Sequence, residues 1–250
     1  MKTIVKILCL ILIFILPRIS NAGEVNVAVA SNFAAPVEQI ALAFQQETGH
    51  KAVISIGSSG KFYTQIKYGA PFQILLSADD ETPARLEKEG DTVLGTRFTY
   101  ATGRLVLWSK KKGIVDDKGE VLKNGTFDRI AIADPKLAPY GFAAIQTLAK
   151  LGIEKQITQK AVWGENIGQT FLFVDTQSTP LGFVALSQVI MDNRLKNGSA
   201  WIVPETLHSP LKQDAVLLLS GKENAAAHAF IKFLKSNKVQ EIIKAFGYQI

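Results

Sequence analysis

Short apolar runs that alternate with helical patterns constrain this chain more than any other feature of its sequence. Apolar and polar side chains alternate over Val25–Val29, as in a strand, and residues 33–44 then repeat at helical spacing. Further strand patterns follow at Val53–Ile56 and Ile74–Leu76, each with a helical pattern behind it. Alternation of this kind builds βαβ units and a mostly parallel sheet, so the sequence predicts an α/β fold.

The same pattern begins again in the second half of the chain, which favours two lobes over one sheet. Strands are expected at Arg104–Trp108, Arg129–Ala133, Leu181–Leu186, Trp201–Val203 and Ala215–Leu219. We expect lobe 1 to hold residues 23–102 plus 209–250, and lobe 2 to hold residues 103–208. Ligands of open α/β sheets bind beyond the carboxyl ends of the strands, so two facing lobes predict a ligand cleft between them.

The first 22 residues have the features of a secretory signal peptide. Lys2 and Lys6 precede an apolar run over Ile7–Leu16, and the small residues Ser20 and Ala22 suit a cleavage site. The run is too short to span a bilayer, which takes about 20 apolar residues. We therefore expect export, cleavage after about Ala22 and a periplasmic mature protein.

The predicted cleavage removes much of the basic signal in the composition. The whole chain has 28 Lys and Arg against 22 Asp and Glu, a net charge of +6, and one cysteine, Cys9. Loss of Lys2, Lys6 and Arg18 leaves 25 basic against 22 acidic side chains, or +3, and no cysteine. A nucleic-acid partner is therefore poorly supported, and the mature sequence excludes disulfides and cysteine-based metal sites.

Four predicted strand-to-helix junctions are rich in small or hydroxylic residues. They are Ala30–Phe33, Gly57–Lys61, Asp134–Gly141 and Glu165–Gly168. A helix start presents unpaired N–H groups and the positive end of the helix dipole, so several starts in one cleft can bind an anion. Ordinary helix capping explains any single junction equally well, because Ser and Asn are common cap residues. The four together favour an anion site.

Enzyme motifs are weak by comparison. Ser58 and Lys61 have the S-x-x-K spacing of serine β-lactamases, but the S-D-N and K-T-G strings of that mechanism are absent. Lys61 is expected to be solvated in the first turn of its helix, and no phosphate-binding or dinucleotide-binding glycine motif occurs. A periplasmic serine hydrolase that uses Ser58 and Lys61 stays open as an alternative.

Other chemistry-bearing residues are expected to have structural roles. Asp79 and its neighbours follow a strand and are expected to cap a helix. The histidines lack metal-ligand spacing and are expected at the surface: His50, His208 and His228. The tryptophans adjoin apolar runs and are expected in the core: Trp108, Trp163 and Trp201.

The strings at these junctions resemble the periplasmic molybdate-binding proteins of ABC importers, which are type II solute-binding proteins. The resemblance covers the whole mature chain. Its carriers are VAVASNFAAP (27–36), GSSGKFYTQI (57–66), GAPFQILLSAD (69–79), IADPKLAPYG (132–141) and PLGFVALSQV (180–189). The resemblance implies a two-lobed fold, each lobe a mostly parallel sheet flanked by helices, with the ligand held between the lobes.

Carried over residue by residue, the resemblance implies that hydroxyls and backbone N–H groups hold the oxyanion, with molybdenum bound only in that form. The implied contacts are Ser31, Asn32, Ser58, Ser59, and the backbone N–H groups of Tyr140 and Ile167. Many members of the family offer a tyrosine hydroxyl where this chain has Ala185, which leaves Asn32 or Tyr140 to compensate.

A site made only of donors suits a fully ionised tetrahedral dianion. Hydrogenphosphate carries a hydroxyl that would face donors, at a cost of about 1–3 kcal/mol. We therefore expect a protein that captures molybdate or tungstate for the membrane permease of an ABC transporter. It is expected to be a monomer, to use no cofactor and not to be an enzyme. Binding of another small oxyanion, such as sulfate, is the nearest alternative.

Overall fold

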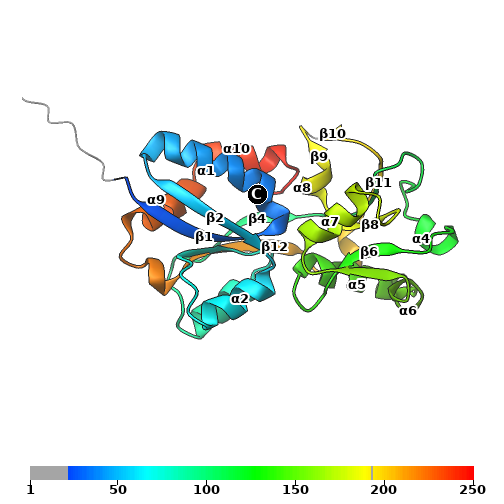
Figure 1. Ribbon diagram of the computed structural model, residues 1–250, viewed down its shortest axis with the longest axis horizontal. Helices are drawn as coiled ribbons and strands as arrows, with labels where there is room; N and C mark the ends of the chain where they lie inside the picture. Colours follow the sequence, from blue (N-terminus) through cyan, green and yellow to red (C-terminus); the bar gives the residue numbers. More distant parts are fainter. Residues whose placement is uncertain (1–21, 193) are drawn as a thin grey trace, which may run out of the picture.

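Two five-stranded sheets, each covered by helices, form the two lobes of the protein (Figure 1). Their strand orders are β2-β1-β3-β12-β4 and β11-β5-β8-β6-β7. The structure is a computed structural model that describes residues 22–192 and 194–250. The predicted signal peptide, residues 1–22, lies outside the described residues except for Ala22. No helix of residues 22–192 and 194–250 is long and apolar enough to cross a bilayer.

The elements of the first lobe surround the first sheet. Its strands are β1 (Glu24–Ala30), β2 (Lys51–Gly57), β3 (Ile74–Leu76), β4 (Phe98–Gly103) and β12 (Leu211–Leu217). Its helices are η1 (Ser31–Phe33), α1 (Ala34–Thr48), α2 (Ser59–Lys67), α3 (Glu81–Lys88), η3 (Leu219–Gly221), α9 (Ala225–Leu234) and α10 (Asn237–Ala245).

The elements of the second lobe surround the second sheet. Its strands are β5 (Leu105–Ser109), β6 (Ile130–Ala133), β7 (Ala161–Gly164), β8 (Gly182–Ala185) and β11 (Ser199–Ile202). Its helices are α4 (Val121–Asn124), α5 (Pro139–Lys150), α6 (Glu154–Thr158), α7 (Ile167–Asp175), α8 (Leu186–Val189) and η2 (Glu205–Leu207). A small antiparallel pair consists of β9 (Ile190–Met191) and β10 (Arg194–Leu195).

Each sheet has one strand that runs against the other four, which confirms the predicted mostly parallel sheets. In the first sheet, β12 is antiparallel to β3 and β4. In the second sheet, β5 is antiparallel to β8 and β11. Both reversed strands come directly after a crossover between the sheets. The carboxyl ends of the other strands face the junction of the lobes, so a strand that enters a lobe from this junction runs the opposite way.

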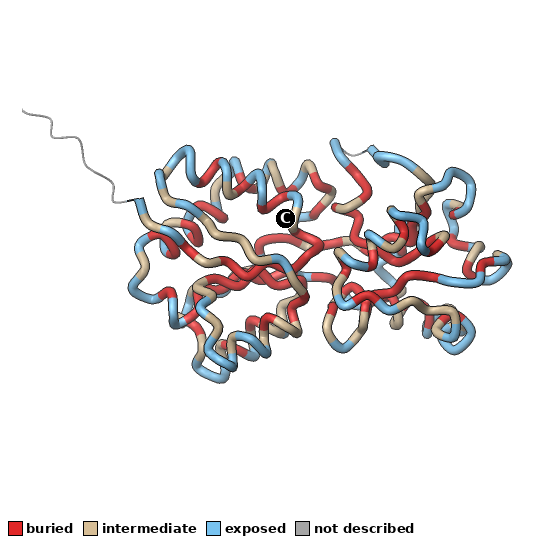
Figure 2. The backbone as a smooth tube through the Cα atoms, in the orientation of Figure 1, coloured by how far each residue is buried: buried red, intermediate tan, exposed pale blue. Residues whose placement is uncertain are grey.

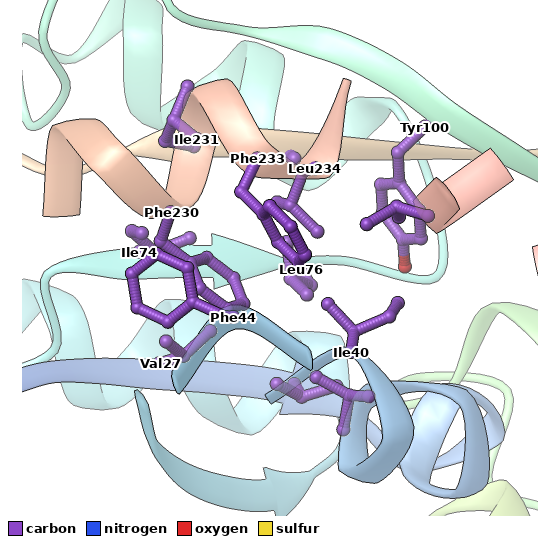
Figure 3. Packing of buried hydrophobic residues seen from close by; sticks show 14 of the residues in the cluster. Val27, Ile40, Phe44, Ile74, Leu76, Tyr100, Phe230, Ile231, Phe233 and Leu234 are labelled. Atoms are coloured by element: carbon purple, nitrogen blue, oxygen red, sulfur yellow. The ribbon is translucent and has the colours of Figure 1, made fainter. Parts of the chain in front are cut away.

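The alternation of side chains along the strands explains why helices cover both faces of each sheet. In β1, Val27 and Val29 face a cluster with α1, α9 and α10, in which the rings of Phe44 and Phe230 meet edge to face at 5.0 Å between centroids (Figure 3). Ala28 faces the other side, toward α2 and α3. Figure 2 shows the same division in both lobes, with buried strands inside and exposed helix turns outside.

Two expectations about individual side chains are wrong. Trp163 is 45% exposed because β7 is the edge strand of the second sheet, whereas Trp108 and Trp201 are buried as predicted. His208 is only 5% exposed, although a surface position was expected. The loop that carries it is fixed to α5, because Ser209 and Gln146 exchange hydrogen bonds of 2.9 and 3.1 Å.

Candidate functional site

A small cavity lies between the two lobes, at the carboxyl ends of the parallel strands. Its volume is about 10 Å³, far below the roughly 300–1,000 Å³ of sites for organic ligands. All six residues predicted from the sequence line it: Ser31, Asn32, Ser58, Ser59, Tyr140 and Ile167. The other lining residues are Ala30, Gly57, Ala78, Ala138, Pro139 and Asn166. None of these residues carries a charge, so an ion in the cavity must be stabilised by dipoles and hydrogen bonds.

Four helix starts converge on this cavity. They are the first residues of η1, α2, α5 and α7. The first N–H groups of a helix have no partner inside the helix, and the helix dipole adds a partial positive charge there. Within these four helices, all of them described, no first turn contains an acidic side chain. No side chain caps η1, α2 or α5, so the starts of these helices are left for a ligand, except that the N–H of Gly60 in α2 bonds the carbonyl of Leu137.

Two serine hydroxyls in the cavity wall are held by backbone N–H groups. Ser31 Oγ accepts the N–H of Gly168 at 3.0 Å, across the lobes, and keeps its own hydrogen to donate. Ser59 Oγ accepts the N–H of Ala78 at 3.0 Å. Both serines are buried. Their oxygens are therefore fixed in position before any ligand arrives.

Ser58 Oγ is buried and has no hydrogen-bond partner among the described residues. Ser58 occupies the N-cap position of α2, yet its side chain does not cap the helix. An unsatisfied buried hydroxyl costs about 1–3 kcal/mol. A ligand in the cavity would remove this cost, so Ser58 is a candidate for ligand contact.

The geometry counts against the serine hydrolase alternative. Lys61 is nearly half exposed in the first turn of α2, as expected, and its Nζ also lies 2.7 Å from Oε1 of the similarly exposed Glu165 in the other lobe. An activated serine needs a base within hydrogen-bond reach, and Ser58 has no such partner among the described residues.

Asn32 and Tyr140 belong to a buried hydrogen-bond network behind the cavity. Asn32 Nδ2 donates to Gln213 Oε1 and to Tyr248 Oη, both at 2.9 Å, and Gln213 Nε2 donates to Tyr140 Oη at 3.1 Å. Asn32 had been expected as one replacement for the hydroxyl that is missing at Ala185. Both hydrogens of its side-chain amide are already donated to other residues, so its side chain does not replace that hydroxyl. Burial raises the pKa of Tyr140 and of Tyr248, so both phenols stay protonated.

Contacts between the lobes surround the cavity, so the structure is the closed arrangement. The N–H of Gly60 donates to the carbonyl of Leu137 at 3.1 Å, next to the Lys61–Glu165 ion pair. A Cβ at Gly60 would lie 3.1 Å from Leu137 Cα, so glycine permits this close approach. The lobes thus meet through backbone groups on one side and through the Ser31–Gly168 bond on the other.

The junction that follows β3 was not predicted to be part of the site. Ala78 lines the cavity, and its N–H fixes Ser59. The signal was available, since Ser77–Asp80 follows a predicted strand at the same edge of the sheet as the other junctions. The predicted capping role of Asp79 is confirmed, because its carboxylate accepts the N–H of Thr82 at 3.0 Å. No group of three His, Cys, Asp or Glu in the described part of the chain could hold a metal ion.

Two lobes closed over a small cavity without charged side chains define a class of protein that binds a small solute between its lobes. The chain belongs to the bacterial extracellular solute-binding protein family, which it matches over residues 25–249.

Two named relatives and one solved structure that this chain resembles in sequence are molybdate-binding proteins. The molybdate-binding protein ModA of Azotobacter vinelandii is 55% identical over 92% of this chain and 91% of its own length. ModA of Rhodobacter capsulatus is 50% identical over 91% of this chain and 88% of its own length. The solved structure of a periplasmic molybdate-binding protein from Azotobacter vinelandii superposes with a TM-score of 0.88 at 42% identity, covering 90% of this chain and 99% of that one.

Proposed function

We propose that the protein captures molybdate or tungstate and delivers it to the membrane permease of an ABC importer. The observation that carries this proposal is the cavity, which offers hydroxyl and N–H donors from both lobes and no charged side chain. The relatives support molybdate over other anions, since those with 50% identity or more are named molybdate-binding proteins.

The proposed contacts are all to the oxygens of the anion. We propose that the anion accepts hydrogen bonds from the hydroxyls of Ser31 and Ser59 and from the backbone N–H groups of Tyr140 and Ile167. Asn32 lines the cavity beside Ser31, while its side-chain amide donates to Gln213 and Tyr248. Ser58 supplies the further hydroxyl that the family obtains elsewhere, because its Oγ is buried and free of other partners in the described chain. A dianion accepts from every one of these donors, whereas a protonated oxyanion must also find an acceptor.

The cellular role follows from the family and the predicted signal peptide. We propose that the protein is exported, cleaved after about Ala22 and active as a monomer in the periplasm. It is not an enzyme on this proposal, because the anion is held only by hydrogen bonds and no nucleophile is activated beside it.

Calorimetric titration of ligand-free protein purified from the periplasm tests the function, and its intact mass checks the cleavage. Molybdate and tungstate are expected to bind tightly, because all their oxygens accept. Hydrogenphosphate is expected to bind at least about 5- to 150-fold more weakly, the equivalent of 1–3 kcal/mol for one unmatched hydroxyl. Binding of sulfate with no heat from molybdate or tungstate would show that the protein serves a different oxyanion.

A further inference from the structure

A buried serine behind the cavity has one hydrogen and two acceptors for it. Ser77 Oγ lies 2.9 Å from Ser59 Oγ and 2.9 Å from Asp79 Oδ1, and Ser77 is completely buried. A serine hydroxyl carries a single hydrogen, so Ser77 donates to only one of these oxygens at a time. Its choice decides what Ser59 presents to the cavity.

The two choices decide whether Ser59 presents a lone pair or a hydrogen to the cavity. When Ser77 donates to Asp79, Ser59 donates its own hydrogen back to Ser77. Because Ser59 Oγ also accepts the N–H of Ala78, it then has only a lone pair left for the cavity, and a lone pair repels an anion. When Ser77 donates to Ser59 instead, the hydrogen of Ser59 is left for the anion.

The charge of Asp79 controls this choice. An ionised carboxylate only accepts, and a hydrogen bond to a charged group is roughly twice as strong as one between neutral groups, so ionised Asp79 holds the hydrogen of Ser77. Asp79 is partly buried and is not a partner in any ion pair of the described residues. Its remaining donors are the N–H and the hydroxyl of Thr82, each at 3.0 Å.

A second pocket connects Asp79 with solvent. This pocket has a volume of about 310 Å³, and Asp79 lies in its wall with Asp80 and Glu81 of the same loop and Lys136 of the other lobe. On the inner side, the hydroxyl of Tyr100 lies 3.0 Å from the carbonyl oxygen of Ser77 and 3.0 Å from Gln213 Oε1, either of which can accept its hydrogen. A proton can therefore reach Asp79 without passing through the anion cavity.

The neighbouring strand β12 adds a further carboxylate, that of Asp214, and one exposed lysine, Lys212. The N–H of Asp214 on β12 donates to the carbonyl of Asp79 at 3.2 Å, and the Asp214 carboxylate is paired with Arg97 at 2.8 Å. Burial raises the pKa of Asp79 above its ordinary value, and the charge of Glu81 acts in the same direction, whereas hydrogen bonds such as those from Thr82 lower it. These surroundings favour protonation of Asp79 once it loses a donor.

We propose that Asp79, acting through Ser77, couples oxyanion binding to the uptake of one proton by its carboxylate; this rests on the proposed function. A dianion in the cavity takes the hydrogen of Ser59, and the hydrogen of Ser77 turns to Ser59. Asp79 thereby loses one donor and takes a proton from solvent, which it releases when the anion leaves. Asp79 is a positioning residue for Ser59 and does not contact the anion.

The coupling sets the direction of the pH dependence. Because the complex holds the proton of Asp79 more tightly than the free protein does, the pKa of Asp79 is higher in the complex. Affinity is therefore greatest below the pKa of Asp79 in the free protein. It falls as pH rises through the pKa in the complex, by up to about tenfold per pH unit for one linked proton.

Calorimetry with micromolar molybdate between about pH 5.5 and pH 8, in two buffers of different ionisation enthalpy, counts the protons taken up. We expect up to one proton for the wild-type protein and none for Asp79→Asn, whose amide keeps the contacts with Thr82 and Ser77 without the charge. The molybdate affinity of Asp79→Asn should therefore lack the fall with rising pH that titration of Asp79 causes in the wild-type protein. Ser77→Ala should also lose the uptake, while the matched control Asp80→Asn should keep it.

Each outcome separates the coupling from the function. Binding by the wild-type protein without proton uptake, or uptake that persists in Asp79→Asn or Ser77→Ala, would overturn the coupling and leave the proposed function standing. A wild-type protein that binds no tetrahedral oxyanion would overturn the proposed function and the coupling together.

Discussion

Replacing Ser31 by alanine is expected to weaken molybdate binding by about 10- to 150-fold. The hydroxyl has two roles, because its oxygen accepts the N–H of Gly168 from the other lobe and its hydrogen is free for the anion. A hydrogen bond to a charged group contributes about 1.5–3 kcal/mol, which corresponds to this range. Calorimetric titration of the variant measures the loss directly.

The matched control is Ser178→Ala, which removes an exposed serine hydroxyl from the second lobe outside the cavity. Its molybdate affinity should equal that of the wild-type protein. Unchanged affinity in Ser31→Ala as well would remove Ser31 from the site and put the proposed anion position in doubt.

Replacing Gly103 by alanine is expected to reduce both stability and anion affinity. Gly103 ends β4, where the chain leaves the first sheet, and a Cβ there would overlap Tyr140 Oη and lie 2.6 Å from Gln213 Nε2. Displacing these side chains should lower the free energy of unfolding by about 1–3 kcal/mol, as overpacking does elsewhere. Affinity should fall too, because Tyr140 lies in the first turn of α5, whose N–H groups are proposed to hold the anion.

Chemical denaturation and calorimetry on the same preparation separate these two effects. Gly23→Ala serves as the control, since a Cβ there would make only ordinary contacts, the nearest at 3.5 Å from Ala226. If Gly103→Ala retains wild-type stability and affinity, then the packing of Tyr140 against the crossover does not position the start of α5.

The sequence predicted the junctions that line the cavity because they share one local signature, and the family resemblance implied the individual contacts within them. Ser31, Ser59 and Ile167 each stand at the point where a strand pattern gives way to a helical one, and parallel strands bring such points to the same edge of a sheet. Fold class followed from the same alternation. Neither prediction needed knowledge of contacts between distant side chains.

Features that depend on distant contacts could not be predicted in this way. Trp163 looks like a core residue in its apolar run, and only the position of β7 at the sheet edge exposes it. The side chain of Asn32 looks like a free donor until Gln213 and Tyr248, far along the chain, accept both of its hydrogens. Polar networks of this kind are set by tertiary packing, which local periodicity does not encode.

The central claim is that the anion lies between the four helix starts, and anomalous diffraction locates it most directly. Crystals of the protein grown with molybdate, measured on both sides of the molybdenum absorption edge, would place the metal without reference to any assumed site. We predict a single strong peak in the cavity, with the oxygens around it within hydrogen-bond distance of Ser31 Oγ, Ser59 Oγ and the N–H groups of Tyr140 and Ile167. A fully occupied peak elsewhere on the molecule, with none in this cavity, would contradict the account.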